Sequence, residues 1–109
     1  MRKPNRFKPN PLLALLTATA TGSLIANPQA PLVVNGQATF SQAGNTLTVT
    51  NTPGAIIQWQ GFSVGAGEIT RFIQQNSNSA VLNRILGQDP TQILGALQSN
   101  GHVFLINPN

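Results

Sequence analysis

The sequence predicts an all-β fold built from short strands in a solenoid-like arrangement. From residue 37 to residue 109 it is poor in charge, rich in Asn, Gln, Ser, Thr and Gly, and divided into short apolar runs by turn residues. Most neighbouring runs are not joined by a strong hairpin pair, and this spacing favours stacked coils of chain over a sandwich. No exact sequence repeat is visible.

The turn residues between the runs define the individual strands. In 46–50, Leu47 and Val49 alternate with β-branched threonines, so the two apolar side chains share one face. Asn-Thr-Pro-Gly at 51–54 and Gly-Ala-Gly at 65–67 are turn sequences. We therefore expect strands in the run that opens at Phe40 and in 46–50, 55–59, 62–64 and 68–75.

Residues 78–98 are ambiguous on local grounds. Apolar residues recur at helical spacing in 81–86 and again in 93–97. Asp-Pro-Thr-Gln at 89–92 has the features of a capped helix start. A glycine close to each run, and the shortness of both runs, weaken a helical interpretation without removing it. Local signals alone therefore favour two short helices here.

The C-terminal residues are predicted to form a strand between two turns. Asn-Gly at 100–101 favours a tight turn, and the apolar run 103–106 follows it. Residues 107–109 then favour the start of another turn. A strand at a free end leaves unpaired backbone groups, which natural sheets rarely expose. We therefore expect the chain to be the beginning of a longer protein, in which a further coil covers this edge.

The N-terminal segment has the pattern of an export signal. A basic region, 1–8, precedes an uncharged, leucine-rich stretch, 11–26. That stretch is interrupted by Thr, Gly and Ser and falls short of the roughly 20 apolar residues of a spanning helix, so no stable membrane anchor is predicted. We expect a helical signal peptide over 1–26, read by the export translocase and cleaved after Ala26 or as late as Ala30. The alternative is an amphipathic or core helix that opens a cytosolic domain.

The formal net charge of +4 does not indicate a nucleic-acid-binding surface. Four of the six basic residues lie within 1–8, and the other two, Arg71 and Arg84, are balanced by Glu68 and Asp89. The electrostatic footprint of nucleic-acid binding is therefore missing from the rest of the chain. With no cysteine there is also no disulfide framework and no thiolate chemistry.

The chain has too few His, Asp, Glu and Cys side chains to build a catalytic or metal-binding site. His102 is the only histidine, and the chain adds one Asp, one Glu and no Cys, which argues against acid–base catalysis, nucleophilic catalysis and a metal site alike. A carbohydrate-hydrolysing enzyme needs clustered carboxylates, whereas Glu68 and Asp89 are 21 positions apart. We expect no catalytic residue, no cofactor and no metal, and hence no enzyme.

Four motifs, in order and at the expected distances, resemble a known family. They are Ala-Ile-Ile-Gln-Trp-Gln-Gly-Phe-Ser-Val-Gly at 55–65, Arg-Phe-Ile-Gln-Gln at 71–75, Ser-Ala-Val-Leu-Asn-Arg-Ile at 79–85, and the segment 95–109, which ends in Leu-Ile-Asn-Pro-Asn. Over roughly residues 34–109 the chain resembles the N-terminal haemagglutination-activity domain of filamentous haemagglutinin-like proteins, the exported partners of two-partner secretion systems. The combination of motifs is specific, although each alone is weak.

The resemblance implies a right-handed parallel β-helix with an N-terminal cap. It replaces the helical interpretation of 80–85 and 93–97 by short strands. It implies that 27–109 is the N-terminal part of a two-partner secretion domain, incomplete at its C-terminus. It further implies recognition in the periplasm by the polypeptide-transport-associated domains of an outer-membrane transporter, passage through its barrel unfolded, and release as a secreted or cell-surface protein. Adhesive, haemagglutinating or toxin activity, and any host surface ligand, would belong to the full-length parent.

The same resemblance places the secretion signal at Asn107, Pro108 and Asn109, and we add Asn83 and Arg84 to the residues expected to contact the transporter. From the residues alone, Asn83 can instead turn inward and satisfy backbone groups, and Arg84 can face outward and pair with an acidic residue.

For the structural core or cap we predict a set of large apolar side chains: Leu47, Val49, Ile57, Trp59, Phe62, Phe72, Leu82, Leu94, Phe104 and Ile106. The alternative to a secretion signal is a non-functional truncated remnant, or a small extracellular β-rich structural protein that self-associates through its C-terminal edge.

Overall fold

The computed structural model describes residues 27–109, and the predicted signal peptide at 1–26 lies outside the described residues. Within 27–109 the chain forms strands and no helix, so no described helix could cross a membrane. The all-β prediction is confirmed. The strands are β1 (Leu32–Asn35), β2 (Ala38–Ala43), β3 (Thr46–Asn51), β4 (Ala55–Trp59), β5 (Ile69–Ile73), β6 (Ala80–Ile85), β7 (Ala96–Ser99) and β8 (His102–Ile106).

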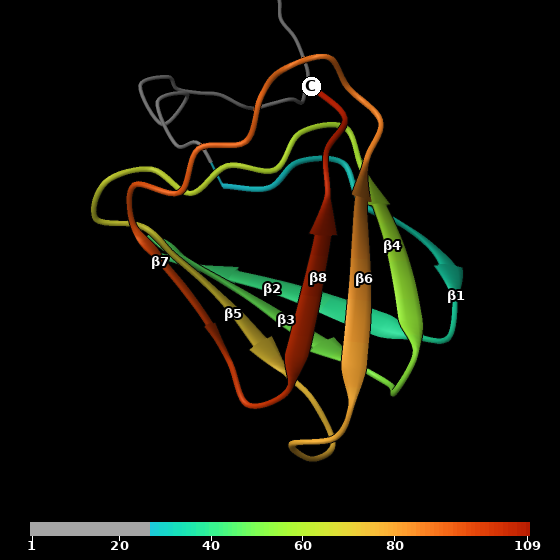
Figure 1. Cartoon of the computed structure of the whole chain (residues 1–109). Coiled ribbons are helices and arrows are strands. Elements are labelled where there is room, and N and C mark those ends of the chain that lie inside the picture. The colour runs from blue at the N-terminus through green and yellow to red at the C-terminus, as the bar shows by residue number, and fades with distance from the viewer. Residues whose placement is uncertain (1–26) are drawn as a thin grey trace, which may run out of the picture.

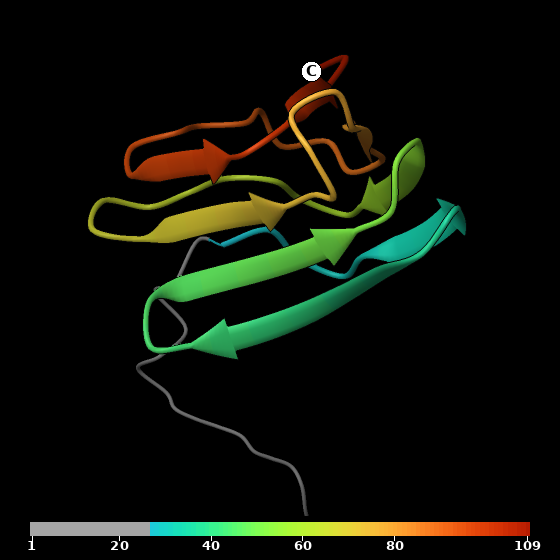
Figure 2. The same ribbon diagram turned by 90° about the horizontal axis from the view of Figure 1, so that it is seen from below.

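The strands form two four-stranded sheets, β1-β4-β6-β8 and β2-β3-β5-β7 (Figure 1). From β3 onward the chain alternates between the sheets and adds one strand to each in turn, so the new strands pair in parallel with those laid down before. Figure 2 shows this second sheet as a stack from β2 to β7. Only β1 with β4 and β2 with β3 are antiparallel, and they begin each sheet.

Turn residues fix where the chain reverses. Gly44 has φ +58°, a left-handed value that favours glycine, and it joins β2 to β3 as a tight hairpin. Thr52 then turns the chain toward β4, with its backbone N–H donating to the carbonyl of Gln37 at 2.9 Å. The stretch 62–64, predicted as a strand, makes only an isolated parallel bridge from Val64 to Ile93.

The core lies between the two sheets and is organised around aromatic rings. Trp59 packs edge-on against Phe40 at 5.6 Å between ring centroids and against Phe62 at 5.4 Å. Phe62 in turn stacks on Phe72 at 6.4 Å. Edge-to-face and offset pairs at these distances stabilise a core beyond the area they bury. The buried apolar residues of this cluster are Leu47, Val49, Ala55, Ile57, Trp59, Phe62, Phe72, Val81 and Ile85.

Three of the predicted core positions, Leu94, Phe104 and Ile106, are wrong because their side chains are exposed, and a fourth, Leu82, is half-buried. Phe104 and Ile106 are 55% and 49% exposed. The reason is strand alternation: Val103 and Leu105 face the core, so Phe104 and Ile106, which alternate with them, face outward. Leu94 is 67% exposed in the connection before β7, where only its backbone N–H is engaged, donating to Val64.

The two segments with helical spacing differ in outcome. Residues 80–85 form β6, as the resemblance implies. Residues 93–97 form a strand only in part, because Ile93 contributes one bridge and β7 begins at Ala96. In β5 the inward positions are Thr70 and Phe72, while Ile73 faces outward.

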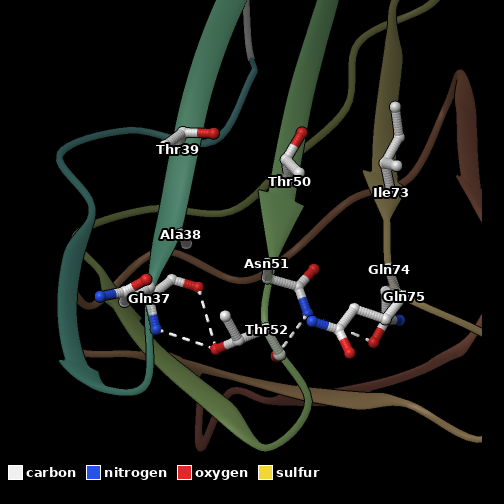
Figure 3. Close-up of a pocket in the computed structure, with 9 residues that line it drawn as sticks. All are labelled: Gln37, Ala38, Thr39, Thr50, Asn51, Thr52, Ile73, Gln74 and Gln75. Atoms are coloured by element: carbon white, nitrogen blue, oxygen red, sulfur yellow. Dashed lines mark hydrogen bonds between the residues drawn. The ribbon is translucent and has the colours of Figure 1, made fainter.

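A ladder of polar side chains crosses the successive coils at the strand ends. Asn51 donates from Nδ2 to Oε1 of Gln74 at 3.3 Å, and the two side chains point toward each other in Figure 3. Gln74 donates from Nε2 to Ser99 Oγ at 3.1 Å and to the His102 carbonyl at 2.9 Å. Asn100 exchanges two hydrogen bonds with the Gln74 backbone. Successive coils are therefore joined by a ladder of polar side chains, of which Asn51 and Gln74 line the pocket drawn in Figure 3.

Candidate recognition site at the end of β8

The turn that follows β8 is held against the connection between β6 and β7. Asn107 donates from Nδ2 to the hydroxyl of Thr91 at 2.8 Å and to the carbonyl of Asp89 at 3.1 Å. In Figure 1 the C-terminal segment and this connection lie at the same end of the sheet, beyond the carboxyl ends of β6 and β8. The predicted secretion-signal residue Asn107 therefore anchors its own turn to an earlier part of the chain.

Asn109 closes the turn. Its backbone N–H donates to Oδ1 of Asn107 at 3.0 Å, the Asx geometry in which an Asn side chain bonds the backbone two residues on. Its side-chain Nδ2 donates to Gly87 O at 2.6 Å and to Asn107 Oδ1 at 2.9 Å. Pro108 is exposed between them. The two amides are thus used within the chain, while the proline ring is free to meet another molecule.

The anchoring connection is itself packed on the coil before it. A Cβ placed on Gly87 would lie 2.0 Å from the carbonyl oxygen of Gln60, so no larger residue fits there without movement. Leu86 donates its N–H to the Trp59 carbonyl at 2.8 Å, and Gln60 donates to Gln29 at 3.0 Å. The conformation of the terminal turn therefore depends on the preceding coils being in place.

Asn83 does not belong to an exposed recognition surface, and its assignment as a transporter contact in the folded domain is wrong. It is fully buried and accepts a hydrogen bond of 2.9 Å from the Trp59 indole nitrogen. Its Nδ2 donates to the Phe104 carbonyl at 3.3 Å. The physical reason is alternation along β6, which turns Asn83 inward with Val81 and Ile85. Its inward role was the alternative that the residues alone left open.

Arg84 is exposed and points away from the core. Its backbone position in β6 is paired with Ile106 in β8, one residue before Asn107, so the structure brings Arg84 close to the terminal turn. Within residues 27–109 the side chain of Arg84 makes no hydrogen bond or ion pair, which differs from the expected pairing with an acidic residue. Of the five residues predicted to contact the transporter, Asn83 alone is buried, and the other four lie at or beside the terminal turn.

The remaining polar groups do not assemble into a chemical centre. Glu68 accepts a hydrogen bond of 2.7 Å from the Gly65 N–H, and the histidine at 102 is exposed. Among residues 27–109 no three His, Cys, Asp or Glu side chains come close enough to hold a metal ion. What the geometry offers is a fixed turn beside an exposed arginine, which suits binding.

Comparison with known proteins decides the family. A model described as TPS secretion domain, where TPS denotes two-partner secretion, matches residues 25–109. The chain belongs to this family. The match includes both the anchoring connection and the terminal turn. Residues 25–109 are therefore the secretion domain of a two-partner secretion substrate.

Named relatives agree with this family. The chain is 37% identical over 108 residues to a heme/hemopexin-binding protein of Haemophilus influenzae strain Rd, and 30% identical over 109 residues to another from the same species. These matches cover 94% of the chain and 12% of the length of each relative. The crystal structure of the HMW1 secretion domain from Haemophilus influenzae is similar, with a TM-score of 0.75 and 44% identity, and the match covers 76% of this chain and 22% of that one.

The sequence patterns do not predict the residues that hold the terminal turn. Gly87, Asp89 and Thr91 contribute two backbone carbonyls and one hydroxyl. The available signal was the Asp-Pro-Thr-Gln run at 89–92, whose turn residues were assigned to a helix start instead of an anchor.

Proposed function

We propose that this TPS domain is the secretion signal and folding nucleus of a two-partner exoprotein, and that the turn Asn107-Pro108-Asn109 is read by the periplasmic polypeptide-transport-associated domains of an outer-membrane transporter. The observation that carries the proposal is the fixed geometry of this turn, in which Asn107 and Asn109 are both bonded to the connection at 87–91. A preorganised turn binds a partner without the entropy cost of ordering it.

The winding of the chain supports a more specific fold within the proposal. In one sheet β3 pairs in parallel with β5 and β5 with β7, and in the other β4 pairs with β6 and β6 with β8. This is the pattern that a parallel β-helix would have. The antiparallel strands β1 and β2 would then be its N-terminal cap. We further propose that 1–26 is the signal peptide that brings the chain to the periplasm, and that the domain itself has no catalytic activity.

The activity of the whole exported protein is a separate proposal. The relatives are named for binding heme and hemopexin, but the chain spans only 12% of their length. We propose that such binding, or an adhesive, haemagglutinating or toxin activity toward a host ligand, resides outside the region matched here.

The test is a binding measurement between the chain and the purified periplasmic region of its cognate transporter. We expect alanine at both Asn107 and Asn109 to weaken binding by at least about tenfold, since 1.4 kcal/mol of lost contact and preorganisation suffices. The matched control is Asn35→Ala at the end of β1, which removes a similar exposed amide hydrogen bond, of 2.9 Å to the Gly54 carbonyl.

The proposal fails if the unaltered chain does not bind, or if the double variant binds as tightly as the unaltered chain. A Pro108→Ala variant separates recognition from folding, because it removes no side-chain hydrogen bond. We expect it to weaken binding at an unchanged thermal unfolding midpoint.

Self-association is the second candidate, and the open edges favour it. Within residues 27–109, β7 and β8 are each paired on one side, and neither contains a charged residue or a proline that would discourage pairing with another chain. Light scattering after size exclusion distinguishes the candidates, because self-association gives a mass that rises with concentration without any transporter.

A further inference from the structure

The two sheets present very different outward faces to solvent. On the sheet β2-β3-β5-β7 the outward side chains are mainly hydroxyls and amides, with Ser41, Thr48 and Gln98 in one row across the strands. On the sheet β1-β4-β6-β8 the corresponding positions are mostly apolar, although they face away from the core. An exposed apolar area on one face, beside a polar one on the other, indicates an interaction surface.

The apolar positions follow from strand register. Ile56 in β4 is paired with Leu82 in β6, which is paired with Phe104 in β8, so these three form one row. The next row holds Gln58, Arg84 and Ile106 in the same order, and Leu32 of β1 adjoins it opposite Gln58. Neighbouring strands lie about 4.8 Å apart, so the side chains of each row are within contact of one another. We call these seven residues the apolar face.

Each sheet carries one outward arginine, and the two are in opposite situations. Arg71 sits between Thr48 and Gln98 and donates from Nε to Gln98 Oε1 at 2.9 Å. Arg84 lies between Gln58 and Ile106, and its side chain makes no hydrogen bond or ion pair with any residue from 27 to 109. Arginine presents several donors in a rigid fork that matches a carboxylate. Arg84 therefore offers an unused anion-binding group within apolar surroundings.

We propose that the apolar face is a docking surface for the periplasmic region of the transporter, whose contacting segment carries an acidic side chain for Arg84 surrounded by apolar side chains. This inference rests on the proposed function and deepens it. The face ends at Ile106, immediately before the terminal turn, so turn and face form one continuous surface. Surrounding apolar contacts exclude water from the ion pair, which strengthens it and sets partner choice.

Charge complementarity argues for such a partner over a second copy of this chain. The strands β1, β4, β6 and β8 contain no Asp or Glu, so the face has no acidic group to offer an identical face. In a two-fold symmetric contact the same patch meets itself, which would place two copies of Arg84 in one interface that has no acidic side chain from these strands. Like charges so placed oppose association.

The experiment compares charge reversal at the two arginines in the transporter-binding measurement. We expect Arg84→Glu to weaken binding by at least about tenfold, because it sets like charges against each other at the contact. Arg71→Glu is the matched control and should change binding by less than about twofold, the scale of an isolated surface charge. Ile106→Thr on the apolar face, against Ile73→Thr on the other sheet, tests the apolar contribution in the same way.

The outcomes separate this inference from the proposed function. If Arg84→Glu and Ile106→Thr bind like their controls while the double alanine variant at 107 and 109 does not bind, the docking surface is wrong and the secretion-signal proposal stands. If the unaltered chain does not bind, both fail. A dimer of the chain that Arg84→Glu dissociates would overturn the inference in favour of a second copy. Circular dichroism of each variant verifies its fold.

Discussion

The indole nitrogen of Trp59 donates a hydrogen bond of 2.9 Å to the side-chain oxygen of Asn83, and both residues are buried. The Asn83 side chain also makes a second hydrogen bond, in which its Nδ2 donates to the Phe104 carbonyl at 3.3 Å. Three strands of one sheet, β4, β6 and β8, are thereby linked through a single polar side chain inside an apolar core. Buried polar groups are stable only when paired, so this amide has a specific place that no apolar residue can fill.

Asn83→Leu tests this link. It leaves the Trp59 N–H and the Phe104 carbonyl without the Asn83 side chain, and an unsatisfied buried group costs about 1–3 kcal/mol. We expect the free energy of unfolding in urea to fall by that amount. The control is Asn78→Leu at an exposed position, which should stay within about 0.5 kcal/mol of the unaltered chain. Equal stability of the two variants would contradict a structural role for Asn83.

Gly87→Ala tests whether the connection after β6 must lie directly on Gln60. The added Cβ would stand 2.0 Å from the Gln60 carbonyl oxygen, so the backbone has to move. Forced overpacking of this kind costs about 1–3 kcal/mol. We expect a lower thermal unfolding midpoint and weaker transporter binding.

Gly61→Ala is the matched change, since nothing lies within 4 Å of a Cβ there. A midpoint for Gly87→Ala equal to that of Gly61→Ala would show that the connection adapts, and that Asn109 does not require Gly87 in its present place.

The strands could be predicted from the sequence where apolar and polar residues alternate strictly. Which side chains of a strand face the core could not be predicted where every residue is apolar. Leu47 and Val49 face the core because threonines occupy the alternate positions of their strand. In β8 every residue from 103 to 106 is apolar, so sequence alone gives no sign that Phe104 and Ile106 face outward. Register with β6, a long-range property, decides it.

The terminal turn could be singled out only through the family resemblance, and the residues that anchor it could not be predicted from the sequence. Asn107 bonds to Thr91 and Asp89 across a separation of 16 to 18 residues, which no local pattern contains. The helical spacing of 81–86 failed for a related reason. Pairing with β4 and β8 on either side outweighs an intrinsic preference that is worth only a few tenths of a kcal/mol per residue.

Gln74→Leu tests the polar ladder. Gln74 is 4% exposed, accepts from Asn51, and donates to Ser99 and His102, so leucine removes three side-chain hydrogen bonds at once. Because Ser99 is exposed, water can replace the hydrogen bond that it loses, which reduces the cost of the substitution. We expect the free energy of unfolding in urea to fall by about 1–3 kcal/mol. Gln75→Leu, at the exposed neighbouring position, serves as the comparison. If both leucine variants unfold at the same urea concentration, the ladder contributes nothing measurable.

Thr91→Val tests how the terminal turn is anchored, without disturbing the core. Valine keeps the shape of the side chain but removes the oxygen that accepts from Asn107 Nδ2 at 2.8 Å. One such hydrogen bond is worth about 1 kcal/mol, so the turn should open roughly fivefold more often. The measurement is hydrogen exchange of the Asn109 backbone amide, which donates to Asn107 Oδ1 and is exposed when the turn opens. Thr48→Val, on the outward face of β3, should leave this exchange rate unchanged. An unaltered Asn109 rate in Thr91→Val would mean that the carbonyls of Gly87 and Asp89 hold the turn by themselves.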